Sequence, residues 1–265
     1  NSTENVSNVI NDYNKLINIK FRKNEKNLGF ALNAIETIKM ANGTYVWLIG
    51  NDDLLLPNAL EDLKNILENN LDAEYFFINS YFYNSKNLAK LPKPINTHEI
   101  NTTSLKSICL LSENKRCKFW DVIDPNVSWD FLIGIFLSVF KREKWLNNLD
   151  VLNHKNISDP TPWTNFDNTC IHPKVLSSSF NNSNAFICSK PLSINLIGER
   201  EWYSLYEFIE IVRIPELLDY YRSKGMPLKK YLYCKNFSLR NFLNYFLKIF
   251  FGGKKSGRNL VNLYK

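Results

Sequence analysis

The residues with the clearest chemical potential are two adjacent carboxylates, Asp52 and Asp53, which follow the amide of Asn51. They come directly after the apolar run 44–49, whose composition is typical of a strand covered on both faces. Ligands of open α/β sheets bind beyond the carboxyl ends of strands, and carboxylates there suit Mg²⁺ or Mn²⁺. A solvated turn is the alternative, because Asn and Asp are ordinary turn residues. The preceding strand and the helix entry at Pro57 favour a ligand site.

Apolar spacing predicts the elements that hold this turn in place. The pattern alternates between the 3.6-residue period of amphipathic helices and the apolar, β-rich runs of strands. Such alternation implies a parallel or mixed sheet with helices packed on it. The predicted helices span residues 5–14, 29–41, 57–69 and 102–114, and the predicted strands span residues 16–21, 44–49, 73–83 and 185–197.

The second half of the chain has a less regular pattern. Residues 131–140 form an apolar run that fits a strand or a buried helix. Residues 150–170 are polar and contain Pro160 and Pro162, so we expect a surface loop that leads into a short helix. From Trp202 onward the spacing is helical. The predicted fold class is α/β, with a mixed, mostly parallel sheet flanked by helices and a helical C-terminal tail.

Composition excludes several classes of protein. Of the 265 residues, 45% are hydrophobic, which is enough for a core and excludes intrinsic disorder. The five cysteines form no CxxC pair and the three histidines are scattered, so neither a disulfide framework nor a zinc site is expected. Reduced thiols are typical of a cytoplasmic protein.

Positive charge is concentrated near the C-terminal end. The formal net charge is +7, and residues 220–265 contain eleven Lys and Arg but no Asp or Glu. Local asymmetry of this kind suggests an anionic surface as partner. No nucleic-acid recognition motif accompanies these residues, so we expect no nucleic-acid partner.

The same region contains an amphipathic helix. A basic amphipathic helix within residues 237–258 can lie in the interface of an anionic membrane. The same apolar stripe also fits a helix packed on the rest of the protein, so both interpretations stay open. The stripe consists of Leu239, Phe242, Leu243, Phe246, Leu247 and Phe250.

Three segments occur in this order along the chain: residues 21–30 (FRKNEKNLGF), 41–53 (ANGTYVWLIGNDD) and 56–60 (LPNAL). In sequence and spacing they resemble the family 2 glycosyltransferases, which have the GT-A fold. The similarity is strongest to the abequosyltransferase-like bacterial branch, which builds surface polysaccharides. It is specific over residues 1–70, extends weakly to about Trp202 and does not cover the tail.

The resemblance implies roles for the acidic turn. Asn51, Asp52 and Asp53 lie at the family's DxD position, where the last carboxylate binds the metal that bridges the donor's diphosphate. Asp53 is therefore the expected ligand of a Mg²⁺ or Mn²⁺ ion, and Asp52 supports it. Asn51 departs from the usual first Asp; its amide can hydrogen-bond the ribose but carries no charge.

The resemblance also extends to the nucleotide site. Residues 27–29 (Asn-Leu-Gly) match the loop that lines this site in the family, and Arg22 stands just before them. Asn27 and Gly29 are thus expected to bind substrate, although a glycine at a helix start is an equal alternative for Gly29. Residues 2–5 resemble the end of the family's first nucleotide motif, so we expect the N-terminal segment of the domain to be missing from this chain.

The family's reaction implies a base. A sugar hydroxyl attacks the anomeric carbon as a nucleoside diphosphate leaves, generally with inversion, and a carboxylate or histidine takes the proton. On a later loop the candidates are Asp167, then His172, and also Asp159, with a solvated Asp or a structural His as the alternative. Trp163, in the polar loop, is the tryptophan expected to stack on a sugar ring, with core packing as its alternative.

The sequence therefore predicts an enzyme, a family 2 glycosyltransferase of the hexosyltransferase type. Residues 1–200 would form its N-terminally truncated GT-A domain, and residues 201–265 its basic helical region. Its expected partners are a nucleotide-sugar donor and a glycan or lipid-linked acceptor, at the inner face of the cytoplasmic membrane or free in the cytoplasm. The alternative is a non-catalytic module that binds a membrane or polyanion through a degenerate GT-A domain.

Overall fold

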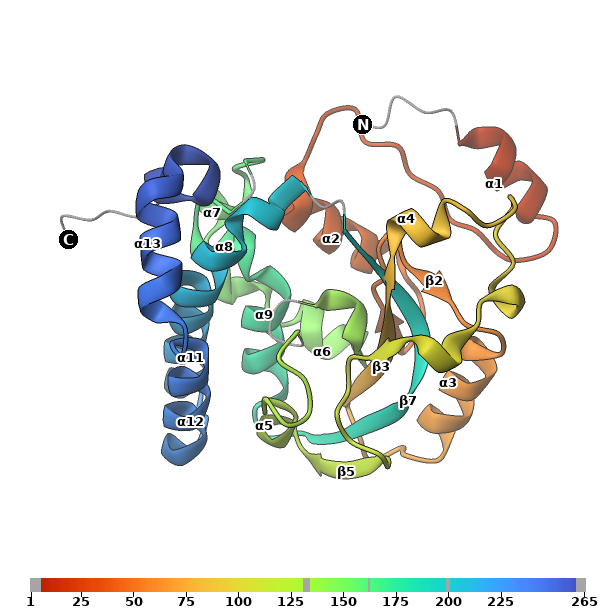
Figure 1. The fold of residues 1–265 in the computed structure, drawn as a ribbon. Helices are drawn as coiled ribbons and strands as arrows, with labels where there is room; N and C mark the ends of the chain where they lie inside the picture. The colour runs from red at the N-terminus through yellow and green to blue at the C-terminus, as the bar shows by residue number, and fades with distance from the viewer. Residues whose placement is uncertain (1–5, 131–133, 162, 199–200, 261–265) are drawn as a thin grey trace.

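The computed structural model describes residues 6–130, 134–161, 163–198 and 201–260. A central sheet runs through the molecule, helices cover its faces, and the C-terminal helices pack along one side (Figure 1). The segment 2–5, which resembles a nucleotide motif, lies outside the described residues.

Among the described residues the sheet has seven strands. Five lie in the order β1-β6-β3-β7-β2, while β4 pairs with β3 and β5 pairs with β7. The strands are β1 (Tyr45–Trp47), β2 (Leu54–Leu55), β3 (Tyr75–Asn84), β4 (Lys106–Ser107), β5 (Lys115–Lys118), β6 (Ser138–Lys141) and β7 (Asn184–Ile197).

The expected mixed sheet is confirmed, but parallel pairing is rarer than expected. β3 and β7 pair in parallel, whereas the other strand pairings of the described residues are antiparallel. The reason is that β6 lies antiparallel between β1 and β3, and the short edge strands also run against their neighbours. β1, β3 and β7 nevertheless share one direction, so their carboxyl ends meet at one edge of the sheet.

Helices flank this sheet, and within the described segments none is both long and apolar enough to cross a membrane. The α-helices are α1 (Ser7–Tyr13), α2 (Gly29–Met40), α3 (Ala59–Glu68), α4 (Ser85–Leu88), α5 (Phe119–Val122), α6 (Arg142–Leu146), α7 (His154–Ile157), α8 (Phe166–Thr169), α9 (Ile171–Phe180), α10 (Tyr206–Phe208), α11 (Ile214–Ser223), α12 (Leu228–Ser238) and α13 (Phe242–Gly252). A π-helix, Ile209–Arg213, joins α10 to α11. Single 3₁₀ turns lie at Thr97–Glu99, Thr102–Ser104, Ile135–Leu137, Leu149–Val151, Glu201–Leu205, Gly253–Ser256 and Arg258–Leu260.

Alternating side chains of β3 bury both faces of the sheet. Phe76 and Ile78 belong to the core cluster that includes α3, and Tyr75 and Phe77 belong to the larger cluster with α2, α9 and α11. Successive side chains of a strand point to opposite faces, so this alternation is what a doubly covered sheet requires. The first six residues of β3 are buried in this way, and the strand becomes more exposed toward its carboxyl end.

Most of the elements predicted around the acidic turn are confirmed. Helices form as α1, α2 and α3, and long strands form as β3 and β7, within a few residues of the predicted bounds. The apolar run 44–49 also becomes a strand, but only Tyr45–Trp47 pairs with a neighbour.

Two predicted elements are wrong. Residues 16–21 form no strand, and Leu16 and Ile17 are exposed, so their apolar character does not mark a core position. Residues 102–114 form no helix; a 3₁₀ turn leads into β4, which pairs with the end of β3. Sheet-edge hydrogen bonds outweigh the weak local helix preference there, because tertiary context routinely overrides propensity.

The second half of the chain also differs from expectation. The run 131–140 ends in β6, and its residues 131–133 lie outside the described part of the chain. The polar stretch 150–170 is not a simple surface loop: it contains α7 and α8, and Asp167 is buried. Its polar side chains hydrogen-bond one another, and such hydrogen bonds offset the cost of burying polar groups.

Candidate active site

The acidic turn, residues 50–53, lies at the edge where β1 and β7 end. The Asp53 N–H donates to the Gly50 carbonyl at 3.3 Å, and the Gly50 N–H donates to Asp53 Oδ2 at 2.8 Å. Asp53 Oδ1 accepts a 2.7 Å hydrogen bond from Asn195 Nδ2, near the end of β7. The turn itself and β7 thus fix the Asp53 carboxylate, so its orientation does not depend on the turn alone.

Asn195 is a site residue that the sequence analysis missed. It lies between Ile194 and Leu196 in β7 and is only 3% exposed. A buried amide needs hydrogen-bond partners, and Asp53 supplies one. An asparagine inside an apolar strand was the available signal, but the sequence does not reveal which loop such a side chain faces.

Gly50 allows the two carboxylates of the turn to converge. A Cβ atom added at this glycine would lie 2.5 Å from Asp52 Oδ1 and 3.2 Å from Asp53 Oδ2. Both carboxylates therefore occupy space that any other residue at position 50 would fill. The structure brings the acidic pair to one point, and Gly50 is a second site residue that the sequence analysis did not single out.

This pair of carboxylates fits a hard divalent cation. Mg²⁺ is commonly held by one or two carboxylates together with substrate phosphates and water, rather than by an all-protein cage. In the described segments no group of three or more His, Cys, Asp or Glu side chains forms such a cage. The donors of the turn, Asp53 and Asp52 with the exposed Asn51 beside them, therefore match the kind of site that a substrate completes.

The predicted nucleotide loop approaches the loop that carries the candidate bases. Asn27 Oδ1 accepts a 2.9 Å hydrogen bond from the Gly29 N–H. Gly29 has φ = +71°, and a Cβ there would lie 2.9 Å from the Cα of Pro160, so both backbone conformation and space require glycine. Arg22 forms a 2.7 Å ion pair with Glu36 of α2. The structure thus brings residues 27–29 against the loop around Pro160.

Trp163, on the same loop, has an unusual backbone. Its φ is +68°, a left-handed conformation that is rare for a bulky residue. Its carbonyl oxygen accepts a 3.1 Å hydrogen bond from the guanidinium of Arg213. The side chain is half-buried against the main core, as the core-packing alternative requires. Backbone outliers of this kind are frequent at functional sites. Stacking of Trp163 on a sugar ring stays a prediction, beside the alternative of core packing.

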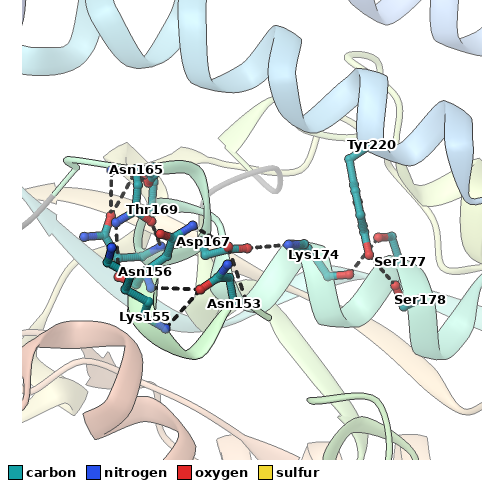
Figure 2. A network of polar contacts seen from close by, with 11 residues as sticks. Asn153, Lys155, Asn156, Asn165, Asp167, Thr169, Lys174, Ser177, Ser178 and Tyr220 are labelled. Carbon is teal, nitrogen blue, oxygen red and sulfur yellow. Dashed lines mark hydrogen bonds and ion pairs between the residues drawn. The ribbon is translucent and has the colours of Figure 1, made fainter. Parts of the chain in front are cut away.

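Asp167 lies inside a network of polar contacts rather than facing solvent (Figure 2). Its carboxylate forms an ion pair with Lys174 and accepts a 3.0 Å hydrogen bond from Asn156 Nδ2. The backbone N–H of Asn153 donates to the same carboxylate at 3.4 Å. These partners join α7, α8 and α9, so the arrangement favours a positioning role for Asp167 over that of a base.

His172, the second predicted base, is buried in α9 with 3% of its surface exposed. Neither ring nitrogen has a hydrogen-bond partner among the described residues, and the edge of Phe30 packs against the ring. Burial lowers the pKa of His172 from 6.5 to about 3. The imidazole is therefore neutral at ordinary pH and lies away from water.

This burial predicts a pH dependence of stability. In the unfolded chain His172 binds a proton below its ordinary pKa of 6.5, whereas the folded protein resists protonation until about 3. Stability is therefore lost as pH falls below 6.5, by up to about 1.4 kcal/mol per pH unit. Chemical denaturation between about pH 7 and about pH 5 should show this loss in the wild type. The loss should be smaller in His172→Leu, while the exposed control His98→Gln keeps it; equal slopes in all three would contradict the assignment.

Asp159 is the most accessible of the three predicted bases. Its carboxylate accepts hydrogen bonds from the Thr161 N–H at 2.9 Å and from Thr164 Oγ1 at 2.8 Å. These hydrogen bonds lower the pKa of Asp159, so it is ionised at neutral pH. It directly precedes Pro160, the residue that touches Gly29. Of the three candidates, Asp159 is therefore the least buried.

The sequence matches known proteins over part of its length. Residues 1–124 match the family model for glycosyl transferase family 2. An uncharacterized glycosyltransferase of Methanocaldococcus jannaschii is 36% identical over 77 residues, which cover 29% of this chain and 27% of that protein. The abequosyltransferase RfbV of Salmonella typhimurium is 37% identical over 62 residues, which cover 23% of this chain and 18% of that protein. The matched segments thus span about a quarter or less of these relatives.

Solved structures share the fold at low sequence identity. The S. aureus protein TarS in complex with UDP superposes with a TM-score of 0.57 at 12% identity, over 99% of this chain and 64% of TarS. Its complex with UDP-GlcNAc gives a TM-score of 0.54 at 14% identity, over 99% of this chain and 65% of TarS. The GT-A-like architecture predicted from sequence is thereby confirmed. Residues 1–124 are thus similar to glycosyl transferase family 2, and the solved structures show that the chain shares their fold.

Proposed function

We propose that this protein transfers a sugar from a nucleotide-sugar donor to a glycan or lipid-linked acceptor in bacterial surface polysaccharide synthesis. The observation that carries the proposal is the convergence of Asp52 and Asp53 over Gly50, tied by Asn195 to the carboxyl edge of the sheet. Within a family 2 domain, an acidic pair at this edge is where a donor diphosphate would bind. TarS, which shares the fold, binds UDP and UDP-GlcNAc, and these are the first donors to test.

Metal dependence is part of the proposal. Asp53 would hold a Mg²⁺ or Mn²⁺ ion, with support from Asp52. When bound, such a cation neutralises negative charge on a departing diphosphate. The protein's own contribution is to fix the Asp53 carboxylate in advance through the Gly50 N–H and the Asn195 amide, so that little reorganisation accompanies binding.

The other predicted site residues would bind the substrates, and one of them would take the proton from the acceptor hydroxyl. The amide of Asn51 would hydrogen-bond the ribose, and residues 27–29 with Arg22 would line the nucleotide. Trp163 would stack on a sugar ring. The acceptor hydroxyl attacks the anomeric carbon, the bond to the diphosphate oxygen breaks, and the configuration inverts in one displacement. We assign the acceptor's proton to Asp159, because a base must be within reach of the substrate and Asp159 is the least buried of the three predicted bases.

A thermal unfolding series tests the proposal. UDP, UDP-GlcNAc and other nucleoside diphosphate sugars are added with Mn²⁺, and the unfolding temperature is compared with that in Mn²⁺ alone. A ligand at about a hundred times its Kd should stabilise the fold by about 2.7 kcal/mol. Lack of stabilisation by every donor would contradict the proposal. It would instead favour the alternative of a non-catalytic membrane-binding module, for which the exposed apolar side of α13 is the supporting observation.

A further inference from the structure

One side of α13 is apolar and exposed. Elsewhere on the helix, Ile249 is only 5% exposed and belongs to the main core, against which Tyr245 also packs. At 3.6 residues per turn the exposed apolar side chains extend over about half of the helix circumference. We call them the α13 face: Phe242, Leu243, Phe246, Leu247, Phe250 and Phe251, with exposed fractions from 37% to 79%.

This arrangement decides between two interpretations of the apolar stripe. The sequence left open whether the stripe packs on the protein or faces outward. Apart from Leu239, which packs against the core, the predicted stripe points away from the protein. Its rings are also ordered: Phe242 stacks on Phe246 at 5.9 Å between centroids, and Phe246 stacks on Phe250 at 6.2 Å. The α13 face is thus a continuous aromatic ridge rather than a set of isolated side chains.

Basic residues border this ridge at its C-terminal end. Lys254 and Lys255 follow α13 directly and are exposed, and within the described part of the chain neither forms an ion pair with a carboxylate. The guanidinium of Arg258 lies 4.6 Å from the ring centroid of Phe250. The whole segment 220–265 contains no acidic residue that would neutralise them.

We propose that the α13 face docks on an anionic phospholipid surface, with the helix lying in the plane of the interface. Aromatic and leucine side chains would enter the boundary between headgroups and acyl chains, while Lys254 and Lys255 contact the anionic headgroups. The basic border favours an anionic lipid surface over a second copy of this chain, because the same segment of a second copy, residues 220–265, offers no carboxylate with which these lysines could pair.

The contacts of α13 connect this surface to the candidate active site. Lys248 forms a 2.9 Å ion pair with Glu207, and a Cβ at Gly257 would lie 2.9 Å from the ring of Phe208. Both partners belong to α10, which begins at Tyr206, shortly after the end of β7, the strand that carries Asn195. In Figure 1, α13 lies along the left side of the molecule, and β7 ends near the top. Docking would hold the α13 side near the lipid, and its value for a lipid-linked acceptor rests on the proposed function.

Vesicle flotation tests the apolar part of the surface. The whole protein is mixed with vesicles of phosphatidylcholine and phosphatidylglycerol, or of phosphatidylcholine alone, and the bound fraction is measured. Wild type should bind the vesicles that contain phosphatidylglycerol at least about tenfold more tightly than the vesicles of phosphatidylcholine alone. The double variant Leu243→Gln with Phe251→Gln should lose most of this binding, whereas Leu71→Gln, at an equally exposed apolar residue outside the α13 face, should not. All three positions are exposed, so the fold is expected to survive, and circular dichroism checks this.

Charge reversal tests the basic border. Lys254→Glu with Lys255→Glu should weaken binding to anionic vesicles by at least about tenfold, and high salt should have a similar effect. The matched control, Lys90→Glu with Lys93→Glu, makes the same charge change at exposed lysines of another loop and should bind as wild type.

Three outcomes would overturn the inference. These are absence of wild-type binding to anionic vesicles, equal binding by the α13 variants, or a dimer in solution that Leu243→Gln with Phe251→Gln dissolves. The last would assign the face to a second copy of the chain. Neither vesicle binding nor dimerisation requires sugar transfer, so failure here is distinguishable from failure of the proposed function.

Discussion

Asp53→Asn is expected to reduce sugar transfer by at least about a hundredfold. The amide keeps the size of the carboxylate and can still accept one of the two hydrogen bonds, from the Gly50 N–H or the Asn195 amide. It removes the negative charge with which the site would hold a cation against the diphosphate. Cation-dependent charge stabilisation is worth several kcal/mol, and each 1.4 kcal/mol is a factor of ten in rate. The measurement is the release of nucleoside diphosphate at saturating Mn²⁺.

The matched control for this variant is Asp72→Asn. Asp72 is exposed just before β3, at the opposite end of that strand from the carboxyl edge, and it accepts a 3.1 Å hydrogen bond from Asn184. Its loss should leave transfer within about twofold of wild type, since surface substitutions away from such sites change little. If Asp53→Asn keeps full activity while its fold is intact, Asp53 does not hold the cation.

Asp167→Asn should destabilise the fold by about 3 to 5 kcal/mol. The variant leaves the Lys174 ammonium without its carboxylate in a site where the lysine side chain is only 11% exposed. Removing one partner of a buried ion pair leaves an uncompensated charge, which is the costly case. The rings of Phe166 and Tyr220, at 5.5 and 5.3 Å from the ammonium, offset only part of that cost. Chemical denaturation measures the effect.

A double variant separates charge pairing from other roles of Asp167. Asp167→Asn combined with Lys174→Met removes both charges and should be more stable than Asp167→Asn alone. The exposed pair Lys190 and Asp62 is the control, and Lys190→Met should cost about 1 kcal/mol or less. If Asp167→Asn were as stable as wild type but inactive, the catalytic assignment to Asp167 would stand instead.

The acidic turn could be predicted from sequence because its signals are local. A short apolar strand, a glycine and two aspartates are contiguous in the chain, and the strand's carboxyl end fixes where they lie. Gly29 was found for the same reason, since the residues 27–29 form a local motif. The structure adds that Gly29 is required by its close approach to Pro160, a residue more than a hundred positions away.

Residues whose role depends on distant partners could not be predicted. The amide of Asn195 has meaning only because β7 lies beside the turn of Asp53, and no local pattern encodes that pairing. Asp167 lies in the polar stretch 150–170, which suggested a surface loop, and His172 follows that stretch, yet both are buried. Their burial follows from the packing of α8 and α9 against α11, which is a tertiary property. The order of preference among the predicted bases changes accordingly in favour of Asp159.

The strands predicted from apolar runs were only partly confirmed, and the reason is again tertiary. The run 16–21 has the composition of a strand but finds no partner strand, and Leu16 stays exposed. Residues 106–107 pair with β3 because an open sheet edge is available beside them. Hydrophobic content predicts where a strand is possible, but a strand forms only where a neighbouring edge supplies hydrogen-bond partners.

The most direct test of the central claim is a crystal structure of the protein grown with a nucleoside diphosphate and Mn²⁺, with anomalous diffraction to locate the metal. We expect an anomalous peak at about 2.1 Å from a carboxylate oxygen of Asp53, in contact with the diphosphate and beside Asp52. A nucleotide bound elsewhere on the molecule, or a metal peak away from the turn that follows β1, would contradict it.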